Sequence, residues 1–232
     1  MYERLRGNGM IQTIFIYKTN QFKMSIIASN SAQQRELIPA GNYIARCYQM
    51  IHIGTVQELI MGEVKTVNKV RIGWELPEER RVFKTENGEQ PFVISKEFTL
   101  SMHEKSNLRK TLASWRGKDF SEDEVKSFDI TKLLGVPCML NVIHKQGKRD
   151  PSKSYEEIAG VSPLPKSVKC PKQENAMLVL DYTNFDYDVY NKLPDFIKDK
   201  IKGSDEYKKL QNPESMSIDN SHETEATDDL PF

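Results

Sequence analysis

Residues Val64–Leu76 read VKTVNKVRIGWEL, and this stretch has the clearest strand pattern in the chain. Its second half alternates, because Lys69 and Arg71 fall on one face while Val70 and Ile72 fall on the other. Polar and apolar residues that alternate with a period of two indicate a strand that turns one face to a core. We therefore expect a long strand here, with a cationic outer face.

The segments on either side extend this pattern. Residues 42–53, NYIARCYQMIHI, are rich in β-branched and aromatic residues and lack helical periodicity, which favours a strand. Leu108, Leu112 and Trp115 recur at helical spacing, and Gly117 is well placed to end that helix. We expect strands at 42–53, 64–76, 91–103, 138–144 and 154–161, a loop at 54–62, and helices at 104–115 and 121–126.

Three strands, a helix and two strands are the order of the five-stranded Greek-key barrel called the OB-fold. The predicted fold is all-β with minor α, with the helix between the third and fourth strands. Sandwiches and other small barrels give similar strings of elements, so they remain alternatives. The expected divisions are an N-terminal extension (1–38), the barrel (39–165), a connector with a strand and a short helix (166–202), and an acidic disordered tail (203–232). Met24 offers a second start, which would make the preceding residues a dispensable leader.

Charge is unevenly distributed along the chain, although the total is zero. Residues 203–232 contain eight acidic residues and two lysines, a net charge of −6, so residues 1–202 carry +6. A basic body joined to an acidic tail is typical of a protein that binds a polyanion and tethers a second partner. Ordinary surface variation is the alternative explanation.

Cysteine content and hydropathy argue against disulfide-rich, zinc-binding and membrane-spanning proteins. The three cysteines, Cys47, Cys138 and Cys170, lie far apart, which argues against a disulfide framework and against a zinc site. The apolar run at 10–17 is interrupted and too short to span a bilayer, and no small-residue cleavage site follows it. We expect a cytoplasmic protein without a metal or cofactor.

The stretch 224–232 ends in Asp228, Asp229, Leu230, Pro231 and Phe232. The phenyl ring can fill an apolar pocket, while the acids can be held by Arg or Lys around it. This tip resembles the acidic tails of bacterial and phage single-stranded DNA-binding proteins, which end in Asp-Asp-(Ile/Leu)-Pro-Phe and recruit replication and repair proteins. The resemblance implies an OB-fold body that coats single-stranded DNA and a tail that binds replication or recombination proteins.

Binding of single-stranded nucleic acid requires cations along the phosphates and exposed rings on which bases stack. In OB-folds the second and third strands and two inter-strand loops form that surface. The candidate contacts are Arg46, Tyr48, Lys65, Lys69, Arg71, Lys96, Phe98, Lys145, Lys148, Arg149 and Tyr155. Phe98 shares its side with Ile94 and Leu100, so it can belong to the core instead, and the row Lys65/Lys69/Arg71 can be an ordinary solvated face.

Other functions remain open. The acids Glu97, Glu104, Asp119, Glu122 and Asp123 have no spacing typical of metal-dependent nucleases, and no phosphate-binding loop or nucleophile elbow is present. We therefore expect no catalysis. Two alternatives to DNA coating are a strand-annealing recombination accessory and a protein-interaction adaptor that never touches DNA. The elements at 176–201 could pack on the barrel or contact a second protomer.

Overall fold

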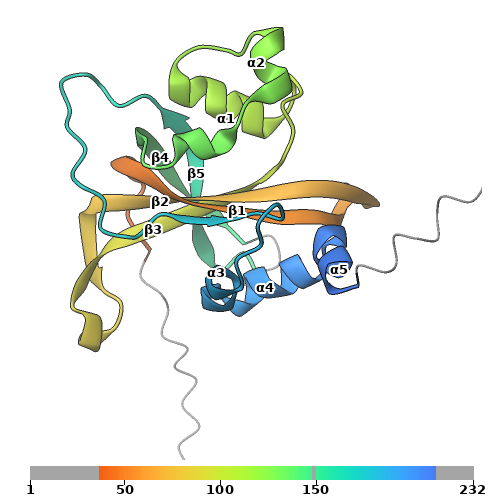
Figure 1. Ribbon diagram of the computed structural model, residues 1–232. Coiled ribbons are helices and arrows are strands. Elements are labelled where there is room, and N and C mark those ends of the chain that lie inside the picture. Colours follow the sequence, from red (N-terminus) through yellow and green to blue (C-terminus); the bar gives the residue numbers. More distant parts are fainter. Residues whose placement is uncertain (1–36, 148–149, 213–232) are drawn as a thin grey trace, which may run out of the picture. The chain divides into compact units, whose positions relative to one another are not determined.

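A computed structural model describes residues 37–147 and 150–212, drawn as the coloured ribbon in Figure 1. Its strands are β1 (Gly41–Ile60), β2 (Glu63–Val82), β3 (Glu89–Thr99), β4 (Pro137–Gln146), β5 (Ser154–Ser162) and β6 (Leu178–Leu180). Its α-helices are α1 (Asn107–Arg116), α2 (Glu122–Ser127), α3 (Tyr187–Lys192), α4 (Asp195–Lys202) and α5 (Asp205–Gln211). The described part is therefore mainly antiparallel β-sheet with a few helices, as predicted from the sequence.

The strands form one sheet in the order β3-β2-β1-β4-β5, and all four neighbouring pairs are antiparallel. β1 pairs with β4 as far as Arg46, and β6 then takes up the same strand in parallel at Gln49–Ile51. The two outer strands approach each other, because Lys96 Nζ of β3 donates a hydrogen bond to the carbonyl oxygen of Ile158 in β5 at 2.6 Å. The sheet is therefore strongly curved.

The loop predicted at 54–62 is wrong, because β1 continues to Ile60. β1 and β2 stay paired to Ile60 and Glu63, and only Met61 and Gly62 form the turn. The register shifts between His52 and Gly54, where Gly54 has a φ of +92°. This irregularity is a bulge, which bends the strand without ending it.

The main core fills one face of the sheet beneath α1. Leu108, Leu112 and Trp115 are buried, which confirms the predicted apolar face of this helix. The Trp115 ring lies 5.8 Å from that of Trp74 in β2, measured between ring centroids. Ser106 caps the start of α1 and Gly117 ends it with a left-handed conformation, so its C-terminal end is also as expected.

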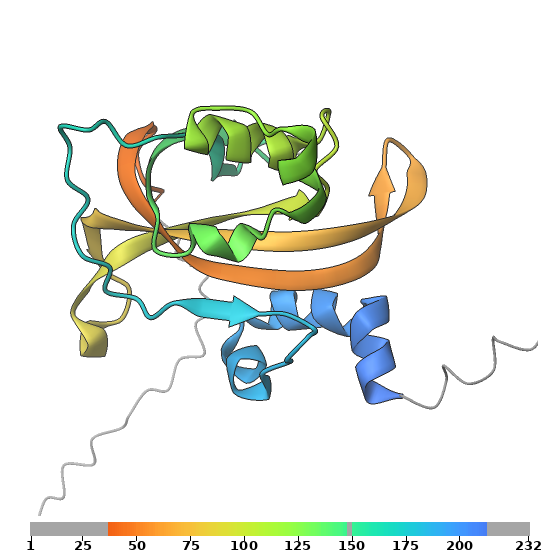
Figure 2. The same cartoon turned by 45° about the horizontal axis from the view of Figure 1, so that its top comes forward.

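A second core lies on the opposite face of β1. Ile51 and Ile53 of β1 pack there with Leu180, Tyr190, Leu193, Ile197 and Ile201. Figures 1 and 2 show the result: α1 and α2 lie on one side of the long β1 and β2 strands, and α3, α4 and α5 lie on the other. The C-terminal helices therefore cover part of the sheet surface that the sequence pattern left open.

The helix α5 falls inside the range 203–232, for which the sequence predicted a disordered tail. Ser204 caps α5 through a hydrogen bond from the backbone N–H of Tyr207. The Glu206 carboxylate accepts hydrogen bonds from Thr55 of β1, from the backbone N–H at 2.6 Å and from the hydroxyl at 2.7 Å. The boundary at 203 is therefore too early, because tertiary contacts order a segment whose local sequence shows no apolar periodicity.

Among the residues that the structure describes, no helix is long and apolar enough to cross a membrane.

Candidate nucleic-acid interface

Glu97 of β3 is the centre of a charge cluster on the surface of β2 and β3. Its carboxylate lies 3.0 Å from Arg71 Nη1, 2.7 Å from Lys200 Nζ and 4.0 Å from Lys69 Nζ. The side chain is only 15% exposed. Burial would raise the pKa of Glu97, but the hydrogen bond from Lys200 and the charges of Lys200, Arg71 and Lys69 outweigh burial and hold the pKa below its ordinary value. Glu97 is therefore a charged anchor that gathers cations from β2 and α4.

The predicted cationic row is present but not free. Lys69 and Arg71 meet at Glu97, and Lys69 also pairs with Glu58 at 2.5 Å. Lys65 lies nearer the hairpin turn, where it pairs with Glu63 at 3.2 Å. Carboxylates already neutralise much of this row, so a ligand would have to compete with them or share the cations.

The first-strand candidates are mainly structural. Arg46 donates hydrogen bonds to the carbonyl oxygens of Gly135 at 2.6 Å and Pro171 at 3.1 Å, which ties the segment after β5 to the sheet. Tyr48 is partly buried, and burial, together with the Glu75 charge, raises its pKa to about 12. Arg46 and Tyr48 are therefore less exposed than expected, and their contact with DNA stays a prediction.

The third-strand candidates also differ from expectation. Phe98 is only 3% exposed and belongs to the main core, so its assignment as a stacking ring is wrong. It alternates with outward-facing Glu97, and the paired strand β2 places Val70 beside it. Lys96 bonds Ile158 and lies 3.9 Å from Glu157, so it links β3 to β5 while remaining partly exposed.

At the hairpin of β4 and β5, Lys145 pairs with Glu157 at 2.8 Å. Tyr155, its partner in the strand register, is 40% exposed and so keeps a ring surface open to solvent. Lys148 and Arg149 of the same hairpin lie outside the described residues, as do Asp228–Phe232.

Two clefts flank the Glu97 cluster, and Lys69 lies on the wall of both. One, of about 540 Å³, runs between β3 and the start of α1 and is lined by Lys96, His103 and Lys105 among others. The second, of about 450 Å³, lies between the β1–β2 hairpin and the helices α4 and α5. Together they trace a surface across β2 and β3.

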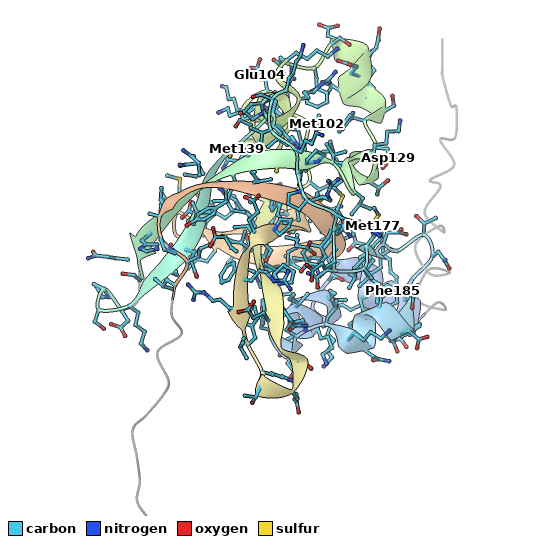
Figure 3. All side chains as sticks on the ribbon, turned by 90° about the vertical axis from the view of Figure 1, so that its left-hand side faces the viewer. Met102, Glu104, Asp129, Met139, Met177 and Phe185 are labelled. Carbon is cyan, nitrogen blue, oxygen red and sulfur yellow. The ribbon has the colours of Figure 1, made fainter. Side chains whose placement is uncertain are left out.

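The β3–α1 connection contributes the least neutralised part of this surface. Lys105 is exposed and makes no ion pair within the described part of the chain. His103 beside it uses Nδ1 to accept a hydrogen bond from the backbone N–H of Lys105. Figure 3 shows Met102 and Glu104, which flank His103, on the opposite side of the strands from Phe185 of the C-terminal part.

Two contributors were not predicted as site residues from the sequence. They are Phe196 and Lys200 of α4. From the sequence we expect Phe196 on the apolar side of this helix, but the Phe196 side chain is 53% exposed, while Ile197 and Ile201 are buried. The exposure of Phe196 could have been predicted from the spacing, because Leu193, Ile197 and Ile201 recur every four residues and Phe196 does not fit that series. Lys200 also follows Phe196 by four residues, which places the two side chains together on the helix surface.

The acids considered for catalysis do not converge. Asp119 pairs with Arg109 at 3.1 Å, and Glu97 is held by cations. Within residues 37–147 and 150–212 there is no group of three or more His, Cys, Asp or Glu residues placed to hold a metal ion.

No protein-family model matches the sequence, and no curated protein matches it. The residues of the chain itself therefore supply the whole basis for a functional assignment.

Proposed function

We propose that this protein binds single-stranded DNA, as a phage-type or prophage-type DNA-binding protein that coats unwound strands during replication or recombination. Its mechanism is equilibrium binding without turnover. The β-rich body supplies the DNA surface, and Asp228–Phe232 supply a docking peptide for partner proteins.

The strand order is the observation that carries this proposal. A meander of three strands followed by two more, in the order β3-β2-β1-β4-β5, is expected for an OB-type barrel. The side-chain hydrogen bond from Lys96 of β3 to the carbonyl oxygen of Ile158 in β5 links the two outer strands, which supports an arrangement of this type. In that fold the second and third strands bind oligonucleotides, and here β2 borders both clefts while β3 borders the larger one.

The charge arrangement favours a surface of moderate affinity. Lys105 is exposed, and Lys65 is exposed although it pairs with Glu63, whereas Lys69 and Arg71 are partly buried and held by carboxylates. Phosphates are strong acceptors for charge-assisted hydrogen bonds, so they can share Lys69 and Arg71 without displacing Glu97. We expect a small number of phosphate contacts and a correspondingly modest salt dependence.

Charge reversal tests the proposed surface. Lys105→Glu and Lys65→Glu should each weaken binding of a labelled oligo-dT and lower the salt slope by about 0.7 for each phosphate that the variant no longer binds. Lys166→Glu is the matched control, because Lys166 is also exposed but belongs neither to β2 nor to the lining of either cleft. Equal binding by all three variants and the unchanged protein would contradict this surface.

Two other functions are separated by simple assays. A strand-annealing accessory would accelerate pairing of complementary oligonucleotides, whereas a coating protein would slow it. An adaptor that never touches DNA is favoured by the neutralised cations around Glu97 and by the exposed Leu59, Met61 and Val64 at the hairpin turn. Such an adaptor would leave the anisotropy of labelled oligo-dT unchanged.

A further inference from the structure

Phe196 has a large apolar side chain that is exposed to solvent beside the charge cluster around Glu97. Its helix, α4, already buries Ile197 and Ile201 in the second core, so packing of the helix does not need the Phe196 ring. One face of the ring is occupied, because the Arg71 guanidinium lies 5.3 Å from the ring centroid. With the side chain 53% exposed, much of the ring surface remains open.

Arg71 is a rigid support for that ring. Its Nη1 binds Glu97 at 3.0 Å, and its Nη2 donates to the hydroxyl of Ser95 at 2.5 Å. A guanidinium held by two partners keeps a fixed plane, and its charge attracts the π-face of the ring. The Phe196 ring therefore lies on a defined support and keeps its orientation.

The surroundings of the ring suit a polyanion. Lys69, Arg71 and Lys200 contribute three positive charges around the one carboxylate of Glu97. The positive charge of Lys69 is also neutralised by Glu58, but the Lys200 side chain remains 43% exposed. An exposed ring next to accessible cations is the combination on which single strands stack their bases and rest their phosphates.

We propose that Phe196 is a stacking platform for a base of single-stranded DNA, with Lys200 positioned for the adjoining phosphate. This inference rests on the proposed function and names the residue that would hold the ligand. Of the rings predicted for the strands, Phe98 is in the core, Tyr48 is partly buried, and Tyr155 is 40% exposed but lies at the β4–β5 hairpin, beside Lys145. The C-terminal helices, which cover the second face of β1, are then also part of the DNA surface.

Oligo-dT titrations of single-ring variants test the platform. Phe196→Ala should weaken binding about tenfold, because a stacked base is lost, and should leave the salt slope unchanged, because no cation is removed. Tyr187→Ala is the matched control: Tyr187 is 48% exposed on α3, and its ring lies against Phe185 and Tyr190 rather than against the Glu97 cluster, so its removal should leave affinity unchanged.

Phe196→Trp provides a direct optical readout. Trp74 and Trp115 are buried, so the intact protein should show little fluorescence change with oligo-dT. Phe196→Trp should bind as tightly as the intact protein and lose fluorescence as bases stack on the new indole. This variant keeps a large ring, so it carries the test even where Phe196→Ala folds poorly.

The outcomes separate the two proposals. Binding by the intact protein, with unchanged affinity of Phe196→Ala and unquenched fluorescence of Phe196→Trp, would overturn the platform and leave the proposed function standing. Absence of binding by the intact protein would overturn both.

Discussion

Glu97 shows how one residue sets the electrostatics of the surface. It holds Arg71 and Lys200 at hydrogen-bond distance and lies 4.0 Å from Lys69, although these cations come from β2 and α4. Removing one partner of a largely buried ionic cluster leaves the others uncompensated. Glu97 therefore stabilises the packing of α4 on the sheet while it reduces the positive charge available to a ligand.

Glu97→Gln should lower the free energy of unfolding by about 1–3 kcal/mol at neutral pH, because the cations lose their charged acceptor. The pKa of Glu97 lies below its ordinary value of 4.5, so its stabilisation is complete above pH 4.5 and is lost as the pH falls through the lowered pKa. The difference in urea-unfolding free energy between the intact protein and Glu97→Gln should shrink over the same range.

Glu104→Gln is the control for this measurement, since Glu104 is exposed and outside the cluster. It should leave stability within about 0.5 kcal/mol of the intact protein. A difference for Glu97→Gln that does not change with pH would exclude the ionic role. In the same variant, oligo-dT affinity should rise because three cations lose their internal counter-ion.

At the level of single residues, the sequence predicted which face of a strand a side chain occupies, but not the residue with which that side chain pairs. Alternation placed Lys69 and Arg71 on one outer face, and their shared contact with Glu97 agrees with that face. The pairing itself could not be predicted, because Lys200 lies more than a hundred residues from Glu97. Phe98 was ambiguous for a related reason: alternation alone does not say which side of an edge strand faces the core.

Among the helices and strands, the contact between β1 and α5 depends on Gly54. A Cβ atom at this position would lie 2.6 Å from Oε2 of Glu206 and 2.8 Å from Cβ of Ser204. These distances are too short for van der Waals contact, so only glycine lets α5 pack against the bulge.

The same contact perturbs Glu206 of α5. Burial would raise the pKa of Glu206, but the hydrogen bonds that its carboxylate accepts from Thr55 outweigh burial and lower the pKa.

Gly54→Ala should therefore destabilise the protein and loosen α5. Gly62→Ala is the matched control, because Gly62 also has a positive φ, +86°, but a Cβ there would meet nothing within 4 Å. Both variants carry the backbone strain of alanine in a left-handed conformation, about 1–2 kcal/mol. Gly54→Ala should lose about 1–3 kcal/mol more from the clash.

Thermal unfolding gives the two stabilities, and amide hydrogen exchange reports on α5. Exchange in residues 205–211 should accelerate in Gly54→Ala and stay unchanged in Gly62→Ala. Equal losses of stability in the two variants would show that α5 does not depend on close packing at Gly54.

Elements with strong local periodicity were predictable, and those that depend on tertiary contact were not. Leu108, Leu112 and Trp115 identified α1, alternation identified the centre of β2, and β-branched and aromatic content identified that of β1. The extension of β1 to Ile60 depends on pairing with β2. α5 has no buried residue of its own and is positioned by Glu206 and Ser204.

At the scale of the molecule, the described residues 37–147 and 150–212 form two apolar cores on opposite faces of β1. The second core assigns residues 178–201 to the folded body, so the segment after β5 does more than connect it to a tail. The two clefts both reach β2, one with β3 and the start of α1 and the other with β1, α4 and α5.

Deletion of Asp228–Phe232 should separate the two proposed activities. The segment 203–232 carries −6 and residues 1–202 carry +6, so the acidic segment should compete weakly with DNA at low salt. The deletion should leave oligo-dT affinity unchanged or slightly higher and abolish capture of replication or recombination proteins. A protein with Asp228→Asn and Asp229→Asn should show an intermediate loss of capture. Weaker DNA binding after the deletion would contradict this division.

The most direct test of DNA binding is an anisotropy titration of labelled oligo-dT with the intact protein at two salt concentrations, about 50 and 200 mM. We predict saturable binding at the lower concentration. At the higher concentration we predict a loss of affinity, with a log–log slope of about −0.7 for each bound phosphate. An unchanged anisotropy at the lower salt concentration, with folded protein in excess, would contradict single-stranded DNA binding by this protein.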